Sequence, residues 1–420
     1  MKSELKQVKN QTNDFSESII RIRKEHARLQ SLEYFADLAR QWYENIVNGK
    51  TRTRTVILGT GVPEELVMAI DASPLRILGG SHESCMWSDD FVPRDTDPVS
   101  RSLLGFVRML QQNDQEHEIL YIIPSNSDSL RKIAYQLMRD GEKVHVLDVP
   151  PSKADELSFG QWKKSLSGMM EAIEQHCRKW ASSASIHKSI RNAVRARTAL
   201  HRFVIMSAGQ EDILSPAVRI LVQNSYSFAA DLSEWTKHMH ELMYEMLMLN
   251  KGRQANHKNN PGVLLVGSPI YFPNLKLPYL LDESGLNIIR QMDAFENIRL
   301  IKPKISKIHR NYRKMIDAVA RAWYKADAST AYLKNEAMRV RIRKMCESQM
   351  VEGVVFHILK GQIEQDFELP WCEEMLEEYG IPLFRLETDY QYQDVEQLRI
   401  RMEAFSELLH QNRFLEKEAV

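Results

Sequence analysis

The amino-acid sequence predicts an α/β protein with two Rossmann-like (flavodoxin-like) parallel-sheet lobes, an N-terminal helical segment and a helical middle region. Short runs of aliphatic and β-branched residues recur along the chain, and several end in glycine or serine. Amphipathic helical patterns separate these runs, and strands alternating with helices imply βαβ units. Residues 155–250 hold few strand-like runs, which predicts helices between the lobes.

Composition limits the classes of protein to be considered. The chain has 420 residues, which exceeds one ordinary core and favours two or three domains. Hydrophobic residues make up 43% and charged residues 27%, a globular balance that excludes a wholly disordered chain. Lys+Arg and Asp+Glu both number 56, so no chain-wide basic field exists and we expect no nucleic-acid partner.

The expected location follows from the apolar runs. None approaches the roughly 18 residues that suggest a membrane span, and the N-terminus lacks the apolar region of a secretory signal. We therefore expect a soluble, cytoplasmic protein without a membrane partner.

The elements of the first half follow in order. Residues 1–50 form the expected N-terminal helical segment, because apolar residues recur at helical spacing without a proline. Residues 51–154 form the first α/β lobe. Its expected strands begin at Val56, Leu75, Glu118 and Lys143, and its expected helices cover 63–70 and 129–139.

The second half repeats this pattern after a helical interval. Residues 155–255 form the helical bridging region, with helices over 162–180 and 231–249, and the linker at 251–262 is rich in turn-forming residues. Residues 256–420 form the second α/β lobe. Its expected strands begin at Gly262, Leu286, Gly353 and Ile381, and its expected helices cover 277–284, 305–350, 371–379 and 395–412.

The candidate ligand site lies beyond the carboxyl ends of the strands, where open parallel sheets bind ligands. Four strand-to-helix loops reach this edge, beginning at Gly59, Pro124, Gly267 and Lys360. Helix N-termini in such loops suit phosphate or carboxylate groups. The loops alone do not identify a ligand, because every α/β domain has them. The chain has no P-loop and no nucleophile elbow, and Glu64 replaces the third glycine of a dinucleotide fingerprint.

Titratable residues near strand ends are secondary candidates. His82, His145 and His357 lie at or near expected strands, where a lone histidine is more often structural than catalytic. His357 is the best of them, because it lies just before Lys360. Glu387 and Asp389 end the last strand, where they would either cap the next helix or orient a ligand.

The cysteines do not indicate a disulfide framework or a metal site. The chain has four, none in a CxxC pair. Scattered single cysteines in helical patterns are usually core residues. They are Cys85, Cys177, Cys346 and Cys372.

Several motifs resemble the 2-hydroxyacyl-CoA dehydratase family, which includes the benzoyl-CoA reductase subunits. The C-terminal half carries Glu352-Gly-Val-Val-Phe-His-Ile-Leu-Lys, then Gly380-Ile-Pro-Leu-Phe-Arg-Leu-Glu-Thr-Asp-Tyr, then Gln397-Leu-Arg-Ile-Arg-Met-Glu-Ala-Phe. Upstream, Gly267-Ser-Pro-Ile-Tyr-Phe-Pro-Asn-Leu-Lys-Leu and Val62-Pro-Glu-Glu-Leu are similar to further family motifs. The resemblance covers most of the chain from about residue 50.

The resemblance implies a subunit of an oxygen-sensitive heterodimer of anaerobic metabolism. In this family an ATP-dependent activator injects one electron through cysteine-held iron–sulfur clusters, and a ketyl radical anion of the acyl-CoA expels the hydroxyl. Soft thiolate ligands support such low-potential clusters. An active member would be a lyase.

The chain departs from the family at its cysteine positions. These positions hold Asp97, Ser127, Ser268 and Gln362. Their oxygen and amide groups do not hold an ordinary [4Fe–4S] cluster. We therefore expect a degenerate iron–sulfur site without a cofactor in this chain, and a [4Fe–4S] cluster in a homologous cysteine-bearing partner subunit.

Three interpretations remain open at this stage. The chain is a cluster-free partner subunit that helps bind acyl-CoA, a non-redox paralogue with an assembly or interaction role, or a dehydratase with unusual ligands. No catalytic acid or base can be named. We expect Lys276 and Lys360 to contact an anionic group such as a CoA phosphate. The alternative is that both are solvated surface lysines without a ligand. The residues expected to border the cleft between the lobes are Gly59, Ser125, Ser127, Ser268, Asn274, Lys276, His357, Lys360 and Gln362.

Overall fold

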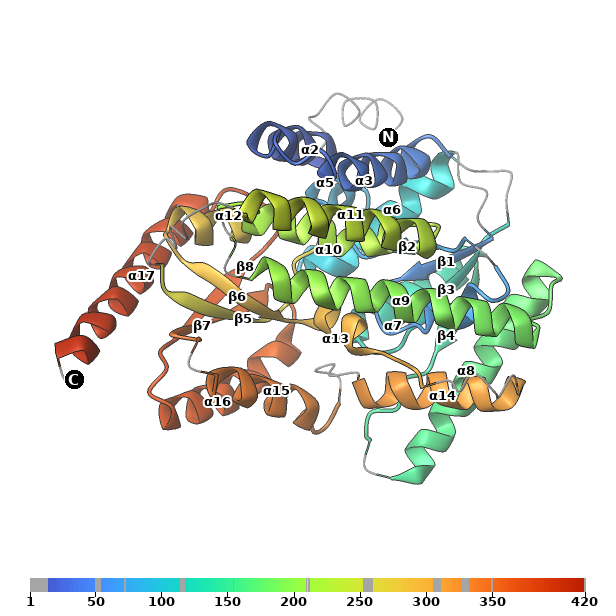
Figure 1. Ribbon diagram of the computed structural model, residues 1–420. Helices are drawn as coiled ribbons and strands as arrows, with labels where there is room; N and C mark the ends of the chain where they lie inside the picture. The colour runs from blue at the N-terminus through green and yellow to red at the C-terminus, as the bar shows by residue number, and fades with distance from the viewer. Residues whose placement is uncertain are drawn as a thin grey trace.

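The computed structural model confirms an α/β fold with two four-stranded, entirely parallel sheets (Figure 1). It describes residues 14–49, 54–71, 73–113, 118–153, 155–208, 210, 212–251, 260–304, 311–326, 332–348 and 350–418. The expected linker at 251–262 lies largely outside these ranges.

The first sheet has the strand order β2-β1-β3-β4. Its central strands are buried along their whole length, as expected for a parallel sheet covered on both faces. The strands are β1 (Thr55–Leu58), β2 (Leu75–Ile77), β3 (Leu120–Pro124) and β4 (Lys143–Leu147).

The second sheet repeats this topology, with the order β6-β5-β7-β8. In both sheets the first strand lies between the second and the third, and the fourth lies at an edge. The two lobes are therefore related in strand order, which the sequence alone does not reveal. The strands are β5 (Gly262–Gly267), β6 (Asn287–Met292), β7 (Gly353–Leu359) and β8 (Leu383–Thr388).

The helices of the first lobe follow its strands. The expected helix over 63–70 is shorter than predicted, and the helices α5 and α6 were not predicted. They are α4 (Glu64–Val67), α5 (His82–Met86), α6 (Pro98–Asn113) and α7 (Asp128–Arg139).

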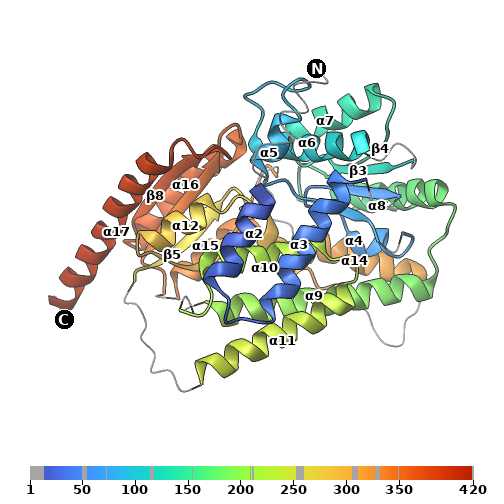
Figure 2. The same cartoon turned by 90° about the horizontal axis from the view of Figure 1, so that it is seen from above.

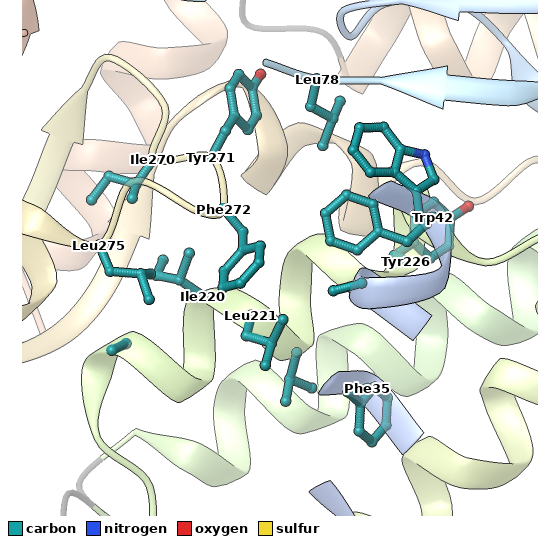
Figure 3. Packing of buried hydrophobic residues seen from close by; sticks show 14 of the residues in the cluster. Phe35, Trp42, Leu78, Ile220, Leu221, Tyr226, Ile270, Tyr271, Phe272 and Leu275 are labelled. Carbon is teal, nitrogen blue, oxygen red and sulfur yellow. The ribbon is translucent and has the colours of Figure 1, made fainter. Parts of the chain in front are cut away.

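Within the N-terminal segment, residues 14–49 are largely helical and join a core shared by both lobes. They form α2 (Asp14–Glu25) and α3 (Leu32–Val47). The Phe15 ring of α2 lies 5.6 Å from Trp42 and 5.2 Å from Phe272, which belongs to the second half of the chain. Figure 3 shows Trp42, Leu78, Tyr271 and Phe272 around this core. The lobes thus share buried apolar surface.

Four helices connect the lobes. The helices α9 and α11 lie side by side along one face of the molecule (Figures 1 and 2). The four are α8 (Glu156–Cys177), α9 (Ser183–Ser207), α10 (Pro216–Phe228) and α11 (Leu232–Asn250).

One helix from the second half of the chain packs against the first lobe. This is α14 (Tyr312–Ala326), whose Met315, Val319 and Trp323 belong to the core cluster beneath the first sheet. The indole of Trp162 in α8 donates to the Ala320 carbonyl at 3.1 Å. The other helices of this half are α12 (Lys276–Glu283), α13 (Ala294–Leu300), α15 (Glu336–Cys346), α16 (Ile363–Glu378) and α17 (Val395–Glu418).

None of the helices in the described part of the chain combines the length and the apolar character needed to cross a bilayer.

Candidate functional site at the junction of the lobes

Loops from the carboxyl ends of the two sheets meet at glycines. Gly80 follows β2, and a Cβ built there would lie 2.5 Å from the Tyr271 carbonyl oxygen in the loop after β5. Gly361 follows β7, and its Cβ would lie 2.9 Å from the Asp95 carbonyl oxygen of the first lobe. Both glycines have a positive φ angle, a backbone conformation that residues with a side chain rarely adopt. The close approach of the lobes therefore depends on the absence of a side chain at both positions.

Three of the four residues that the family resemblance assigns to cysteine positions form one chain of hydrogen bonds. The Ser268 hydroxyl donates to Gln362 Oε1 at 2.7 Å. Gln362 Nε2 makes a long hydrogen bond of 3.5 Å to Asp97 Oδ1. The same Asp97 oxygen accepts from the Ser100 amide at 2.9 Å in the first turn of α6. The chain thus links the loops after β5 and β7 to the first lobe.

The fourth of these residues has a separate role. Ser127 is the N-cap of α7, and its hydroxyl accepts from the Leu130 amide at 3.4 Å. Burial raises the pKa of Glu364 in α16, and the charges of Asp97 and Asp128 raise it further. The hydrogen bonds thus join Asp97, Ser268 and Gln362, whereas the Ser127 hydroxyl contacts its own helix.

His357 is buried and fully engaged in hydrogen bonds. Its Nδ1 lies 3.1 Å from the Ser268 carbonyl oxygen, and its Nε2 lies 2.8 Å from the Thr388 hydroxyl. Burial lowers the pKa of His357 to about 4, so the ring is neutral at neutral pH. A neutral ring with both nitrogens engaged orients its neighbours, and it does not offer a free base. The Ser268 hydroxyl also accepts from the Leu359 amide at 2.8 Å.

The two candidate lysines share one carboxylate. Lys276 Nζ donates to the Gln391 carbonyl at 2.6 Å and to Asp394 at 2.7 Å, and it lies 3.8 Å from Asp389. Lys360 Nζ donates to Asp389 at 2.9 Å. The Lys276 side chain is 1% exposed, whereas that of Lys360 is 56% exposed. An anionic ligand would therefore meet Lys360 first, and it would have to displace a carboxylate to reach Lys276.

Two buried groups lie beside Asp97. The Cys85 thiol donates to the carbonyls of Ser81 at 3.3 Å and Pro98 at 3.5 Å, and burial raises its pKa. Tyr390 packs with Cys85, and its hydroxyl has no hydrogen bond of normal geometry within the described residues. Cys85 is therefore protonated and unreactive in these surroundings.

The remaining candidates have structural roles. Ser125 at the end of β3 is buried, and its hydroxyl accepts from the Val149 amide at 2.9 Å. Gly59 has φ of 73° and donates its amide to the Ile77 carbonyl at 2.8 Å. The backbone amide of Asn274 donates to the Tyr271 carbonyl at 2.9 Å. These contacts hold the loops in place, and any direct contact with a ligand stays a prediction.

Among the remaining predicted candidates, His82 begins α5 and is half-buried, and His145 lies within β4. Burial lowers the pKa of both histidines. Glu387 lies on β8, and its Oε2 is 3.4 Å from Arg385. Asp389 both binds Lys360 and accepts from the Gln391 amide at 2.9 Å. Asp389 therefore holds the turn after β8 and pairs with Lys360, whereas a role in orienting a ligand stays a prediction.

A buried ionic network that the sequence did not predict connects α4 with α9. Arg197 of α9 is fully buried and donates to Glu64 at 2.5 Å and to Glu65 at 2.7 Å. The Tyr226 hydroxyl donates to Glu64 at 2.6 Å, and the Trp323 indole donates to Glu65 at 2.9 Å. The only signal was the Val62-Pro-Glu-Glu-Leu motif, since nothing in the sequence connects it to Arg197.

The donor atoms at the junction suit hydrogen bonding better than iron. Asp97, Ser127, Ser268 and Gln362 supply oxygen and amide nitrogen, and no thiolate. Across the described residues, no three histidine, cysteine or acidic side chains are grouped so as to hold a metal ion. The side chains present do not fit an ordinary [4Fe–4S] cluster, which needs several cysteines.

Comparisons with known proteins agree with the motifs. A family model described as "2-hydroxyglutaryl-CoA dehydratase, D-component" matches residues 60–409. The "Putative dehydratase subunit YjiM" of Escherichia coli (strain K12) is 23% identical over 352 residues, which cover 83% of this chain and 90% of that protein. The "(R)-phenyllactyl-CoA dehydratase beta subunit" of Clostridium sporogenes is 23% identical over 353 residues, which cover 83% of this chain and 89% of that protein.

Proposed function

Since this chain belongs to the 2-hydroxyglutaryl-CoA dehydratase D-component family, we propose that it is a cluster-free partner subunit of a 2-hydroxyacyl-CoA dehydratase complex. In this proposal the chain helps to bind acyl-CoA in the cytoplasm. A homologous subunit with cysteines carries the [4Fe–4S] cluster and receives its electron from an ATP-dependent activator. We derive no electron-transfer step within this chain.

The observation that carries the proposal is the hydrogen-bonded set Ser268, Gln362 and Asp97. The family resemblance assigns these residues to cysteine positions, and their side chains are hydrogen-bonded to one another. Hard oxygen donors disfavour a low-potential cluster. The positions have become a connection between the lobes, which suits a subunit that shapes a pocket without performing electron transfer.

A partner role has two further supports. One relative is named a beta subunit, which fits a complex of several chains. In addition, Ile363 and Phe367 lie one turn apart at the start of α16, directly after Gln362, and are 65% and 80% exposed. Neighbouring exposed apolar side chains beside a candidate site are a feature of surfaces that a partner covers.

Acyl-CoA binding is supported by the exposed Lys360. Its ammonium group stands at the carboxyl end of β7, where it faces solvent beside Asp389. A CoA phosphate or the thioester end of a bound acyl-CoA is the type of anionic or polarised group that such a lysine contacts. Lys276 lies behind it and holds Asp394 in place.

Anaerobic purification with iron and sulfide analysis tests the cluster-free part of the proposal. We expect the chain alone to contain far less than stoichiometric iron, both as isolated and after anaerobic reconstitution. Co-expression with a cysteine-bearing homologue should give a heterodimer whose iron resides in the partner. Stoichiometric iron and sulfide in the isolated chain, with an EPR signal on reduction, would refute the proposal.

Calorimetry on the full chain tests the acyl-CoA part. Lys360→Ala should weaken acyl-CoA binding by about tenfold, because it removes one charge-assisted contact. The exposed Lys164 of α8 provides the matched control, and Lys164→Ala should leave the affinity unchanged. Equal affinities for the native chain and Lys360→Ala would exclude Lys360 from the binding site.

A further inference from the structure

A groove of about 740 Å³ lies between α9 and α11, away from the residues discussed above. Its volume is within the range of small-molecule sites. The two helices run side by side along one face of the molecule, as both views show (Figures 1 and 2). The groove is open to solvent, so a ligand can enter without any rearrangement of the core.

The wall formed by α9 is strongly positive. This helix contains no aspartate or glutamate, and apart from the buried, paired Arg197 it carries four lysines and arginines. Arg195 and Arg202 line the groove, and they lie on the same face because seven residues complete two helical turns. Both are exposed, and within the described residues neither has an ion pair or a side-chain hydrogen bond. Their charges are therefore available to a ligand.

The positive charge extends beyond these two arginines. Burial lowers the pKa of Lys302, and the charges of Arg299 and Arg202 lower it further. Lys237 contributes a further cation from α11. The acidic residue in the groove lining is Glu241, which lies 2.7 Å from His238 and 3.7 Å from Lys237. One carboxylate thus does not neutralise the groove.

The wall formed by α11 contributes two planar side-chain rings to the groove. Tyr244 lines the groove and is 62% exposed, and His240 lies one turn before it on the same helix. A large exposed aromatic ring next to cations suits a ligand that has both a flat ring and anionic groups, because the ring can stack and the arginines can bind phosphate oxygens.

We propose that the α9–α11 groove binds a nucleoside polyphosphate group. Arg195 and Arg202 hold its phosphates, and Tyr244 stacks on its base. The spacing of about 10 Å between the two arginines along the helix suits an elongated polyanion better than a single phosphate. A free nucleotide and the nucleotide end of a CoA thioester both carry this group. This proposal goes beyond acyl-CoA binding at the lobe junction, because it concerns a separate groove that could also bind a free nucleotide.

Isothermal titration of the full chain with ADP, CoA and inorganic pyrophosphate at fixed salt tests this site. We expect saturable ADP binding that the double variant Arg195→Glu/Arg202→Glu weakens by about tenfold or more. Tyr244→Ala should weaken ADP binding and leave pyrophosphate binding unchanged. Circular dichroism and the milder pair Arg195→Gln/Arg202→Gln show whether a loss arises from unfolding.

Arg191 provides the matched control. It is an exposed arginine of the same helix, has no ion pair within the described residues and does not line the groove. Arg191→Glu should change the ADP affinity by less than about twofold if the site is specific. An equal loss in Arg191→Glu and the double variant would show a general charge effect and overturn the proposal, as would the absence of ADP and CoA binding.

The source of the nucleotide group follows from the same titrations. If CoA binds and competes with ADP, the groove holds the nucleotide end of CoA. If ADP binds and CoA does not compete, the ligand is a free nucleotide. If acyl-CoA affinity depends on Lys360 while neither ADP nor CoA binding depends on Arg195 and Arg202, the groove proposal fails and the proposed function stays intact.

Discussion

Ser268 and Gln362, which follow neighbouring strands of the second sheet, are joined by a hydrogen bond of 2.7 Å between Oγ and Oε1. Gln362 then reaches Asp97 in the first lobe. At positions where the family resemblance implies sulfur ligands, the chain thus has side chains that bind one another. These side chains therefore connect the lobes.

Ser268→Ala should lower the free energy of unfolding by about 1–3 kcal/mol, because the Leu359 amide and the Gln362 side chain each lose a buried partner. Chemical denaturation of the full chain measures this change. Ser189 in α9 is a half-buried serine for comparison, and Ser189→Ala should change the free energy by less than about 0.5 kcal/mol. Similar values for the two variants would show that the Ser268 contacts contribute nothing.

Arg197→Met should destabilise the protein by about 3–5 kcal/mol, because it leaves Glu64 and Glu65 buried without their cation. Thermal and denaturant unfolding test this prediction. Arg191→Met on the exposed face of the same helix should be nearly neutral. Adding Glu64→Gln and Glu65→Gln to Arg197→Met should restore part of the stability, and a further loss instead would contradict the charge-burial explanation.

The protein should lose stability as the pH falls from about 6.5 to about 4, in part through His357. Burial lowers the pKa of its folded form to about 4 from the ordinary value of 6.5. In this window the unfolded state binds the proton and the folded state does not, so acid favours unfolding. His357→Gln should reduce the slope of stability against pH between these values. An unchanged slope would show that other groups dominate.

Gly80→Ala should destabilise the protein by about 1–3 kcal/mol or more, because the new Cβ would meet the Tyr271 carbonyl at 2.5 Å and φ is 98°. Gly160 in α8 is the opposite case, since a Cβ there meets nothing within 4 Å. Gly160→Ala should stabilise the helix by up to about 1 kcal/mol. Differential scanning calorimetry of both variants should give melting temperatures that move in opposite directions.

Local patterns were sufficient to predict the strands. Buried β-branched runs at Val56, Glu118, Gly262 and Gly353 each contain a strand, because both faces of a parallel strand need apolar residues. The helix α6 was missed. Its middle carries Gly105, which is a weak helix former in isolation. A Cβ at Gly105 would clash with the Ser84 carbonyl oxygen of α5. The close packing of α5 against α6 therefore requires glycine at this position.

The candidate site was predictable only in part. Ser268, His357 and Gln362 follow or end neighbouring parallel strands, and the structure brings them into contact at the carboxyl ends of these strands. That they border a ligand cleft stays a prediction. The sequence could not predict the contact with Asp97, because that contact depends on how the lobes pack. The pairing of Arg197 with Glu64 and Glu65 was equally inaccessible, since no local periodicity connects groups so far apart in the chain.

The packing of α14 against α8 has a consequence for how the polypeptide matures. Apolar surface beneath the first sheet stays uncovered until the ribosome has released residues 312–326. A nascent chain stalled before residues 312–326 leave the ribosome should therefore remain protease-sensitive in its first half. It should also recruit chaperones until these residues have emerged.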